Sequence, residues 1–197
     1  SGMQLQAKLQ AEKIRYLAAG SAADQAAVVP SLVLSLNGSP ENATISLSAQ
    51  AQQGGKNAQL DTVVQAGLAG GKGTAPLDWQ ASFEKLQAQF TLDKDKPGPW
   101  LAQLQPGAPL QIKQRTSGQT VLNTVYQFSA GQLQLIPPKL GIRRTRTEAL
   151  KPAQLVWDSG SITHTGSGQW GVQSSGQAKG LPLAWVDAFS FGDDEPP

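Results

Sequence analysis

Side chains that could carry catalysis are scarce in this sequence. The chain has no cysteine, which excludes disulfides, thiolate metal sites and cysteine nucleophiles. Its single histidine, His164, would have to serve any Ser-His-Asp triad, yet no Gly-X-Ser-X-Gly segment is present to carry the nucleophile. The acidic residues are scattered, and no pair of them stands out as a general acid and base. We therefore expect no catalytic residues, no metal and no cofactor, and we interpret His164 as a polar strand residue.

Two glycine-containing segments resemble phosphate-binding motifs. Residues 166–171 (GSGQWG) have the G-X-G-X-X-G spacing of dinucleotide-binding loops, but no helix follows them. Residues 71–74 (GKGT) lack the Ser or Thr that follows the lysine of a phosphate loop. We interpret both segments as turn or strand glycines, so neither predicts a nucleotide cofactor.

The densest group of like charges is formed by Arg143, Arg144 and Arg146. Guanidinium groups bind phosphate well, so one interpretation is a contact for lipid phosphates or for an acidic partner. The other is a set of solvated charges that protects a loop or a sheet edge, and this is the interpretation we favour. The net charge of +2 is too small to favour binding of nucleic acid.

Apolar and polar residues alternate along most of the chain, and the pattern restarts after each break. Leu32, Leu34 and Leu36 begin it, and it returns at 43–51, 60–68, 79–83, 86–92 and 124–128. Side chains two residues apart share one face of a strand. The sequence therefore predicts a long sheet with one apolar face and one wet face that is rich in Gln and Ser.

The predicted strands cover most of the chain and are joined by short breaks. We expect strands at 31–37, 42–52, 58–68, 77–93, 109–115, 120–129, 131–136, 153–158, 160–166 and 168–179, and a loop at 19–30 that ends in Pro30. Residues 4–18 alternate like a strand but have the Ala, Gln, Lys and Glu content of a helix, and we favour a strand there. Turn residues fill the breaks, as in Asp158-Ser159-Gly160. Breaks this short require antiparallel neighbours and leave no room for crossover helices.

Two local changes of period stand out. Between Phe83 and Leu86 the apolar phase shifts by one residue, which predicts a bulge near Glu84-Lys85. Near the end, Leu183, Val186 and Phe189 are spaced by three, which predicts a short helix. We expect a cloning scar at 1–3, a single elongated β domain at 4–191 that is part of a larger protein, and a flexible tail at 192–197. No segment has the pattern of a signal peptide or the length of a membrane span.

Several short segments, taken in order, resemble the TamB-like family, the translocation and assembly module proteins. The resemblance rests on LSLNG at 34–38, DWQASFEKL at 78–86, GPWLAQL at 98–104, LVWDSGSI at 155–162, GSGQW at 166–170 and GLPLAW at 180–185. The family is similar to the AsmA-like group and to the bridge-like lipid transfer proteins. The resemblance implies an inner-membrane-anchored periplasmic protein of a diderm bacterium. Its body would be a curved sheet shaped like a taco, with an apolar inner groove.

The resemblance also implies a function in phospholipid movement between the inner and outer membranes, and in assembly of outer-membrane β-barrels and autotransporters with a TamA-like partner. We accordingly expect an all-β fold with a long, curved, mostly antiparallel sheet, an open groove on its apolar concave face, and a short C-terminal helix. The residues expected to line the groove are Leu34, Leu36, Ile45, Leu47, Trp79, Phe83, Leu86, Phe90, Tyr126, Phe128 and Trp157.

Two functions stay open at this stage. In the first, the groove holds phospholipid acyl chains, and neighbouring segments of the same parent chain extend it. In the second, the sheet edges pair with unfolded outer-membrane strands by β-augmentation. Alternation alone does not distinguish an open groove from the closed core of a two-sheet sandwich.

Overall fold

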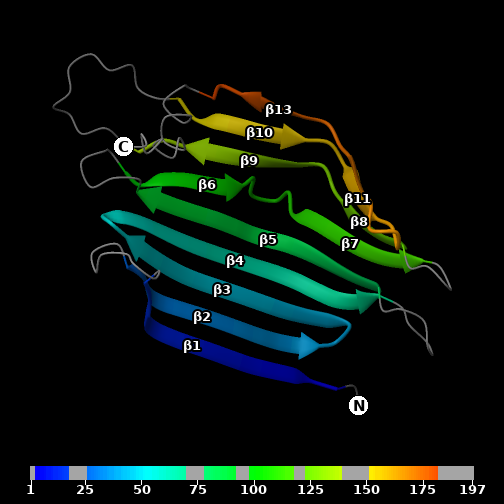
Figure 1. Ribbon diagram of the computed structural model, residues 1–197, viewed down its shortest axis with the longest axis horizontal. Coiled ribbons are helices and arrows are strands. Elements are labelled where there is room, and N and C mark those ends of the chain that lie inside the picture. The colour runs from blue at the N-terminus through cyan, green and yellow to red at the C-terminus, as the bar shows by residue number, and fades with distance from the viewer. Residues whose placement is uncertain are drawn as a thin grey trace.

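The computed structural model describes residues 3–17, 26–69, 78–91, 98–117, 123–138 and 151–181. Every regular element in these ranges is a strand, and all strands belong to one large antiparallel sheet that does not close on itself (Figure 1). The described strands contact one another chiefly as hydrogen-bonded neighbours, so the sheet is a single layer and not a sandwich. The predicted all-β fold with one long, open, antiparallel sheet is therefore confirmed.

The first five strands are long and follow one another in chain order. They are β1 (Leu5–Tyr16), β2 (Ala27–Ser39), β3 (Asn42–Gln53), β4 (Lys56–Ala69) and β5 (Asp78–Thr91), and Figure 1 shows them side by side. Glycines with positive φ make the tight turn at Gly54-Gly55 between β3 and β4. Alternation over 12 to 14 residues thus gives each strand one apolar and one polar side.

One predicted loop is partly wrong. Residues 27–30 belong to β2, although Pro30 lacks the N–H that a strand usually donates. The pairing between β2 and β3 shifts in register between Val28 and Ser31, so Pro30 lies in an irregularity of the ladder. Proline is tolerated in sheets at such positions, which is why the strand begins earlier than the sequence indicates.

The remaining strands are shorter and form the second half of the sheet. They are β6 (Trp100–Leu104), β7 (Leu110–Ser117), β8 (Asn123–Phe128), β9 (Gly131–Ile136), β10 (Ala153–Trp157), β11 (Gly160–His164), β12 (Trp170–Gln173) and β13 (Gly176–Lys179). β5 pairs with β6 through one half of its length and with β7 through the other. From there the sheet continues along two branches, β6-β9-β10-β13 and β7-β8-β11-β12.

The two branches meet along a line of strand breaks that we call the crease. It runs through residues 105–109, 129–130, 158–159 and 174–175, each between two successive strands. Backbone hydrogen bonds tie the breaks to their neighbours: Ser129 N donates to Gln111 O of β7 at 2.9 Å, and Asp158 N donates across to Ser175 O of the next break at 2.9 Å. Figure 1 shows β7, β8 and β11 leaving β6, β9 and β10 at an angle.

The crease corrects the expectation of a turn at Asp158-Ser159-Gly160. β10 and β11 do not pair with each other, because β10 lies between β9 and β13 while β11 lies between β8 and β12. The break between β8 and β9 is of the same kind. These short breaks bend a strand path that continues in the same direction, whereas the sequence alone indicated chain reversals.

The predicted bulge in β5 is confirmed. Val64 pairs with Phe83 and Val63 pairs with Lys85, which leaves Glu84 as an extra residue. The bulge lies where the partner of β5 changes from β7 to β6, so the crease begins there. The extra residue returns Leu86 to the side of the sheet that carries Phe83.

The most buried part of the sheet lies where β6, β9 and β10 run side by side. Trp100 is 5% exposed, Leu135 6% and Ala153 0%, and they form one cluster with Phe90, Ala102, Leu133 and Leu155 packed around it. Register places all seven on the same side of the sheet. Most of these residues are direct cross-strand partners, so the pairing of β5, β6, β9 and β10 brings their side chains together.

Some predictions lie outside the described residues. These are the arginines Arg143, Arg144 and Arg146, the helix predicted beyond Pro182 and the tail at 192–197. The described ranges hold no helical segment with the length and hydrophobicity needed to span a bilayer.

Candidate functional site

The strand register places all eleven predicted groove residues on one side of the sheet, which we call the apolar face. In antiparallel pairs, residues directly opposite each other share a face. Leu34 pairs with Leu47, Leu47 with Thr62, and Thr62 with Leu86. In the next row, Leu36 pairs with Ile45, Ile45 with Val64, and Val64 with Phe83. The remaining predicted members connect through the same ladders: Trp79 and Phe90 in β5, Tyr126 and Phe128 in β8, and Trp157 in β10.

The apolar face is larger than the predicted groove. It also carries Leu60, Val64, Trp100, Leu110, Ile112, Leu133, Leu135, Leu155, Ile162 and Val172. Most of these belong to strands of four to eight residues, where two or three alternating positions give only a weak signal. Leu133 and Leu135 alternate with glutamines, and this alternation is a sequence signal from which these two members of the apolar face could have been predicted.

The apolar face stays open at both ends of the sheet. Leu9 in β1 is 56% exposed, and Trp170 and Val172 in β12 are 65% and 73% exposed. Between these ends most of its side chains are half-buried by their cross-strand neighbours. Among the described residues no second layer of strands or helices covers the apolar face, and exposed apolar patches of this kind mark binding sites.

Aromatic rings cover the apolar face near the crease. The rings of Trp79 and Tyr126 lie 6.4 Å apart at 56°, although β7 separates their strands. Trp157 lies over Gly131 and beside Gly176, its two cross-strand partners, and Phe128 lies over Gly160. A Cβ atom at Gly131 or Gly160 would collide with those rings, so the glycines make room for them.

The few polar side chains that share the apolar face mostly satisfy one another or the backbone. Thr62 donates to Lys85 O at 2.8 Å, and Gln114 Nε2 donates to Thr116 Oγ1 at 2.6 Å. His164 packs against Trp170 with ring centroids 4.4 Å apart. His164 belongs to β11, as predicted, and its ring lies at the open end of the apolar face.

The opposite side of the sheet, the polar face, is coated with neutral hydrogen-bonding groups. Gln103 Nε2 donates to Gln134 Oε1 at 3.3 Å, and Thr44 Oγ1 donates to Gln65 Oε1 at 3.0 Å. Side-chain hydrogen bonds, first from Gln59 and then from Ser48, hold the pKa of Asp61 below its ordinary value. Asp61 is a charged acceptor in this network.

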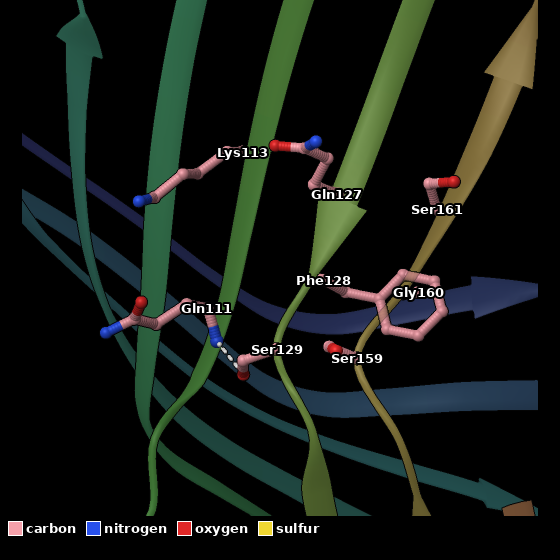
Figure 2. A pocket seen from close by; sticks show the side chains of 8 residues that line it. All are labelled: Gln111, Lys113, Gln127, Phe128, Ser129, Ser159, Gly160 and Ser161. Carbon is pink, nitrogen blue, oxygen red and sulfur yellow. Dashed lines mark hydrogen bonds between the residues drawn. The ribbon is translucent and has the colours of Figure 1, made fainter. Parts of the chain in front are cut away.

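One hollow lies mostly on the polar face, and Phe128 is the one predicted groove residue that lines it. It has a volume of about 410 Å³ beside the crease, and Figure 2 shows Gln111 and Lys113 of β7, Gln127 of β8 and Ser161 of β11 around it. Gln111 N donates to Ser129 Oγ at 3.0 Å at its floor. A second hollow of about 290 Å³ shares Gln111 and Lys113. Amides, hydroxyls and one ammonium line the first hollow together with the Phe128 ring and Gly160, and these groups provide no nucleophile–base pair.

The remaining motifs carry no site in the described chain. Gly166 and Gly168 belong to the tight turn between β11 and β12, where Gly168 N donates to Thr165 O at 2.8 Å and Gly168 has φ 85°, and Gly171 lies in β12. Residues 71–74 lie outside the described residues. Among the described residues, no three His, Asp or Glu side chains come together as metal ligands.

Comparison with known proteins adds no relative: no family model, curated protein or solved structure matches this chain.

Proposed function

We propose that this chain is a non-enzymatic segment of a TamB-like lipid conduit, and that phospholipid acyl chains lie on its apolar face. One observation carries the proposal: the apolar face is continuous from β1 to β12 in an open, single-layer sheet. An acyl chain needs a continuous dry surface, and each methylene that it buries contributes about 0.8 kcal/mol. Leu, Ile, Val, Phe and Trp side chains supply such a surface without specific polar contacts.

The wet side of the sheet fits the same function. A trough that carries lipid through an aqueous compartment needs an outer surface that stays hydrated. The Gln, Ser and Thr side chains of the polar face provide this with little net charge. We place the parent protein in the periplasm, anchored in the inner membrane and working with a TamA-like outer-membrane partner, on the sequence resemblance alone.

Native mass spectrometry with lipid extraction tests this proposal. We expect phospholipid to be released from the purified chain, and to be depleted in Phe90→Glu but retained in Gln89→Glu. Phe90 and Gln89 are neighbours in β5 and lie on the apolar and polar faces. Because Phe90 packs against the buried cluster, the melting temperature of both variants must be measured alongside. A folded wild-type chain that never carries lipid would contradict the proposal.

A further inference from the structure

The two hollows of the polar face adjoin and form one elongated depression, which we call the polar trough. They share Gln111 and Lys113 of β7. From β7 the second hollow extends across β5 and β4, and the first extends the other way across β8 and β11. The trough therefore crosses five neighbouring strands inside the sheet, which is about 19 Å at about 4.8 Å per strand.

Strand register arranges most of the trough's lining in two rows of cross-strand partners. The first row consists of Gly67, Gln80, Lys113, Gln127 and Ser161, and the second of Gln65, Ser82 and Gln111. Figure 2 shows Lys113, Gln127 and Ser161 in a row across three strands. Glycine and serine side chains are small, so these positions leave a space that the longer glutamine and lysine side chains border.

The turn between β2 and β3 bounds the trough at β4. Leu68 N donates to Pro40 O at 2.9 Å, which holds the turn against this strand. A Cβ atom at Gly67 would collide with Glu41 O, so the glycine is what allows the turn to lie there. The trough is therefore bounded by backbone at this end, and not by flexible side chains alone.

The trough offers hydrogen-bonding groups that the chain itself leaves unused. The side chains of Gln80, Gln111 and Gln127 form no hydrogen bond with any residue in the described ranges. Elsewhere on the polar face, Gln103 donates to Gln134. A carboxamide can donate two hydrogen bonds and accept others, and a hydroxyl can do both. The lining therefore suits a ligand that is itself rich in groups that donate and accept.

The charge on the trough is small and does not favour an ionic ligand. Within the part of the chain that the structure describes, Lys113 is the only charged residue lining the first hollow, and Glu41 joins it in the second. Phosphate and carboxylate groups are bound best by arginine forks and clustered cations. A peptide strand would need an unpaired backbone edge, whereas β5, β7 and β8 are paired on both sides.

We propose that the polar trough binds an oligosaccharide, an uncharged chain of sugar units laid across β4, β5, β7, β8 and β11. Each sugar hydroxyl donates and accepts hydrogen bonds, as the amides and hydroxyls of the trough do. The Phe128 ring lines the first hollow and gives the C–H face of a sugar ring an apolar surface to pack on. This inference does not rest on the proposed function, because the trough lies mostly on the polar face and the lipid on the apolar face.

Two-dimensional NMR of the isotope-labelled chain tests the site with two soluble probes, maltohexaose and chitohexaose. We expect at least one hexasaccharide to shift the backbone amide signals of Gln80, Lys113 and Gln127 until they saturate. The signals of Gln103 and Gln134, on the same face but outside the trough, should stay in place. No shift with either probe, or equal shifts over the whole polar face, would overturn the proposal.

Substitutions of exposed trough residues supply the second readout. Gln127→Ala should weaken binding of the hexasaccharide about fivefold, the usual effect of losing one hydrogen bond, and the matched control Gln103→Ala should not. Lys113→Gln removes the charge but keeps a donor, so binding should change less than about twofold. Equal losses in Gln127→Ala and Gln103→Ala would overturn the proposal. So would a large loss in Lys113→Gln, or inorganic phosphate binding at Lys113 in place of the hexasaccharides, since either would indicate an anion site.

Discussion

Replacing Leu47 with glutamate is expected to reduce bound phospholipid about tenfold or more while leaving the sheet folded. Leu47 lies in the middle of the apolar face, opposite Leu34 and Thr62. A carboxylate there must stay hydrated, and removing its water to admit an acyl chain costs more than the 1.4 kcal/mol that corresponds to tenfold. The measurement is the amount of phospholipid per protein after incubation with vesicles of phosphatidylethanolamine and phosphatidylglycerol.

The matched control for this substitution is Ser46→Glu. Ser46 is the preceding residue of β3, so its side chain is on the polar face, between Ser35 and Val63. A new charge there should leave lipid binding within about twofold of wild type, as surface substitutions usually change little. Equal loss of lipid in both variants would contradict the assignment of faces. Unfolding of both Leu47→Glu and Phe90→Glu would favour a closed core.

Trp100→Ala is expected to lower the free energy of unfolding by about 3–5 kcal/mol, the usual cost of truncating a buried aromatic residue. Trp100 packs with Leu135 and Ala153, and the three are the most enclosed side chains of the cluster at β6, β9 and β10. Loss of the indole leaves a cavity, and β6 cannot move to fill it easily because it is hydrogen-bonded to a strand on each side. The midpoint of urea denaturation measures the effect.

Trp170→Ala is the companion variant, since Trp170 is also on the apolar face but is 65% exposed in β12. We expect a loss below about 1 kcal/mol, because little of its surface is removed from water. The comparison separates the folding core from the open part of the same face. Equal losses in the free energy of unfolding for the two variants would show that the cluster around Trp100 is not the folding core.

Much of the sheet could be predicted because alternation is a local signal. The period of two along β3 and β4 assigns faces wherever the strands lie, and the phase shift between Phe83 and Leu86 is sufficient to place the bulge near Glu84-Lys85. These assignments depend on the geometry of a single strand. They therefore hold without knowledge of strand order.

The strand order in the second half of the sheet could not be predicted, because it depends on long-range pairing and not on a local pattern. Trp100, Leu135 and Ala153 are far apart in sequence and meet only because β6 pairs with β9 and β9 pairs with β10. The short breaks at Ser129-Ala130 and Asp158-Ser159 have the composition of turns, yet they bend a continuing strand path. Local turn chemistry is the same in both cases, and long-range pairing decides between them.

The central claim is that lipid lies on one side of this sheet. Its most direct test is photo-crosslinking from a probe amino acid placed at successive positions of β3, with phospholipid vesicles present. The register predicts crosslinks at Ile45, Leu47 and Ala49, and none at Ser46, Ser48 and Gln50. Lipid adducts with a period of two would support the conduit. Adducts at every position, at the polar positions, or at none would contradict it.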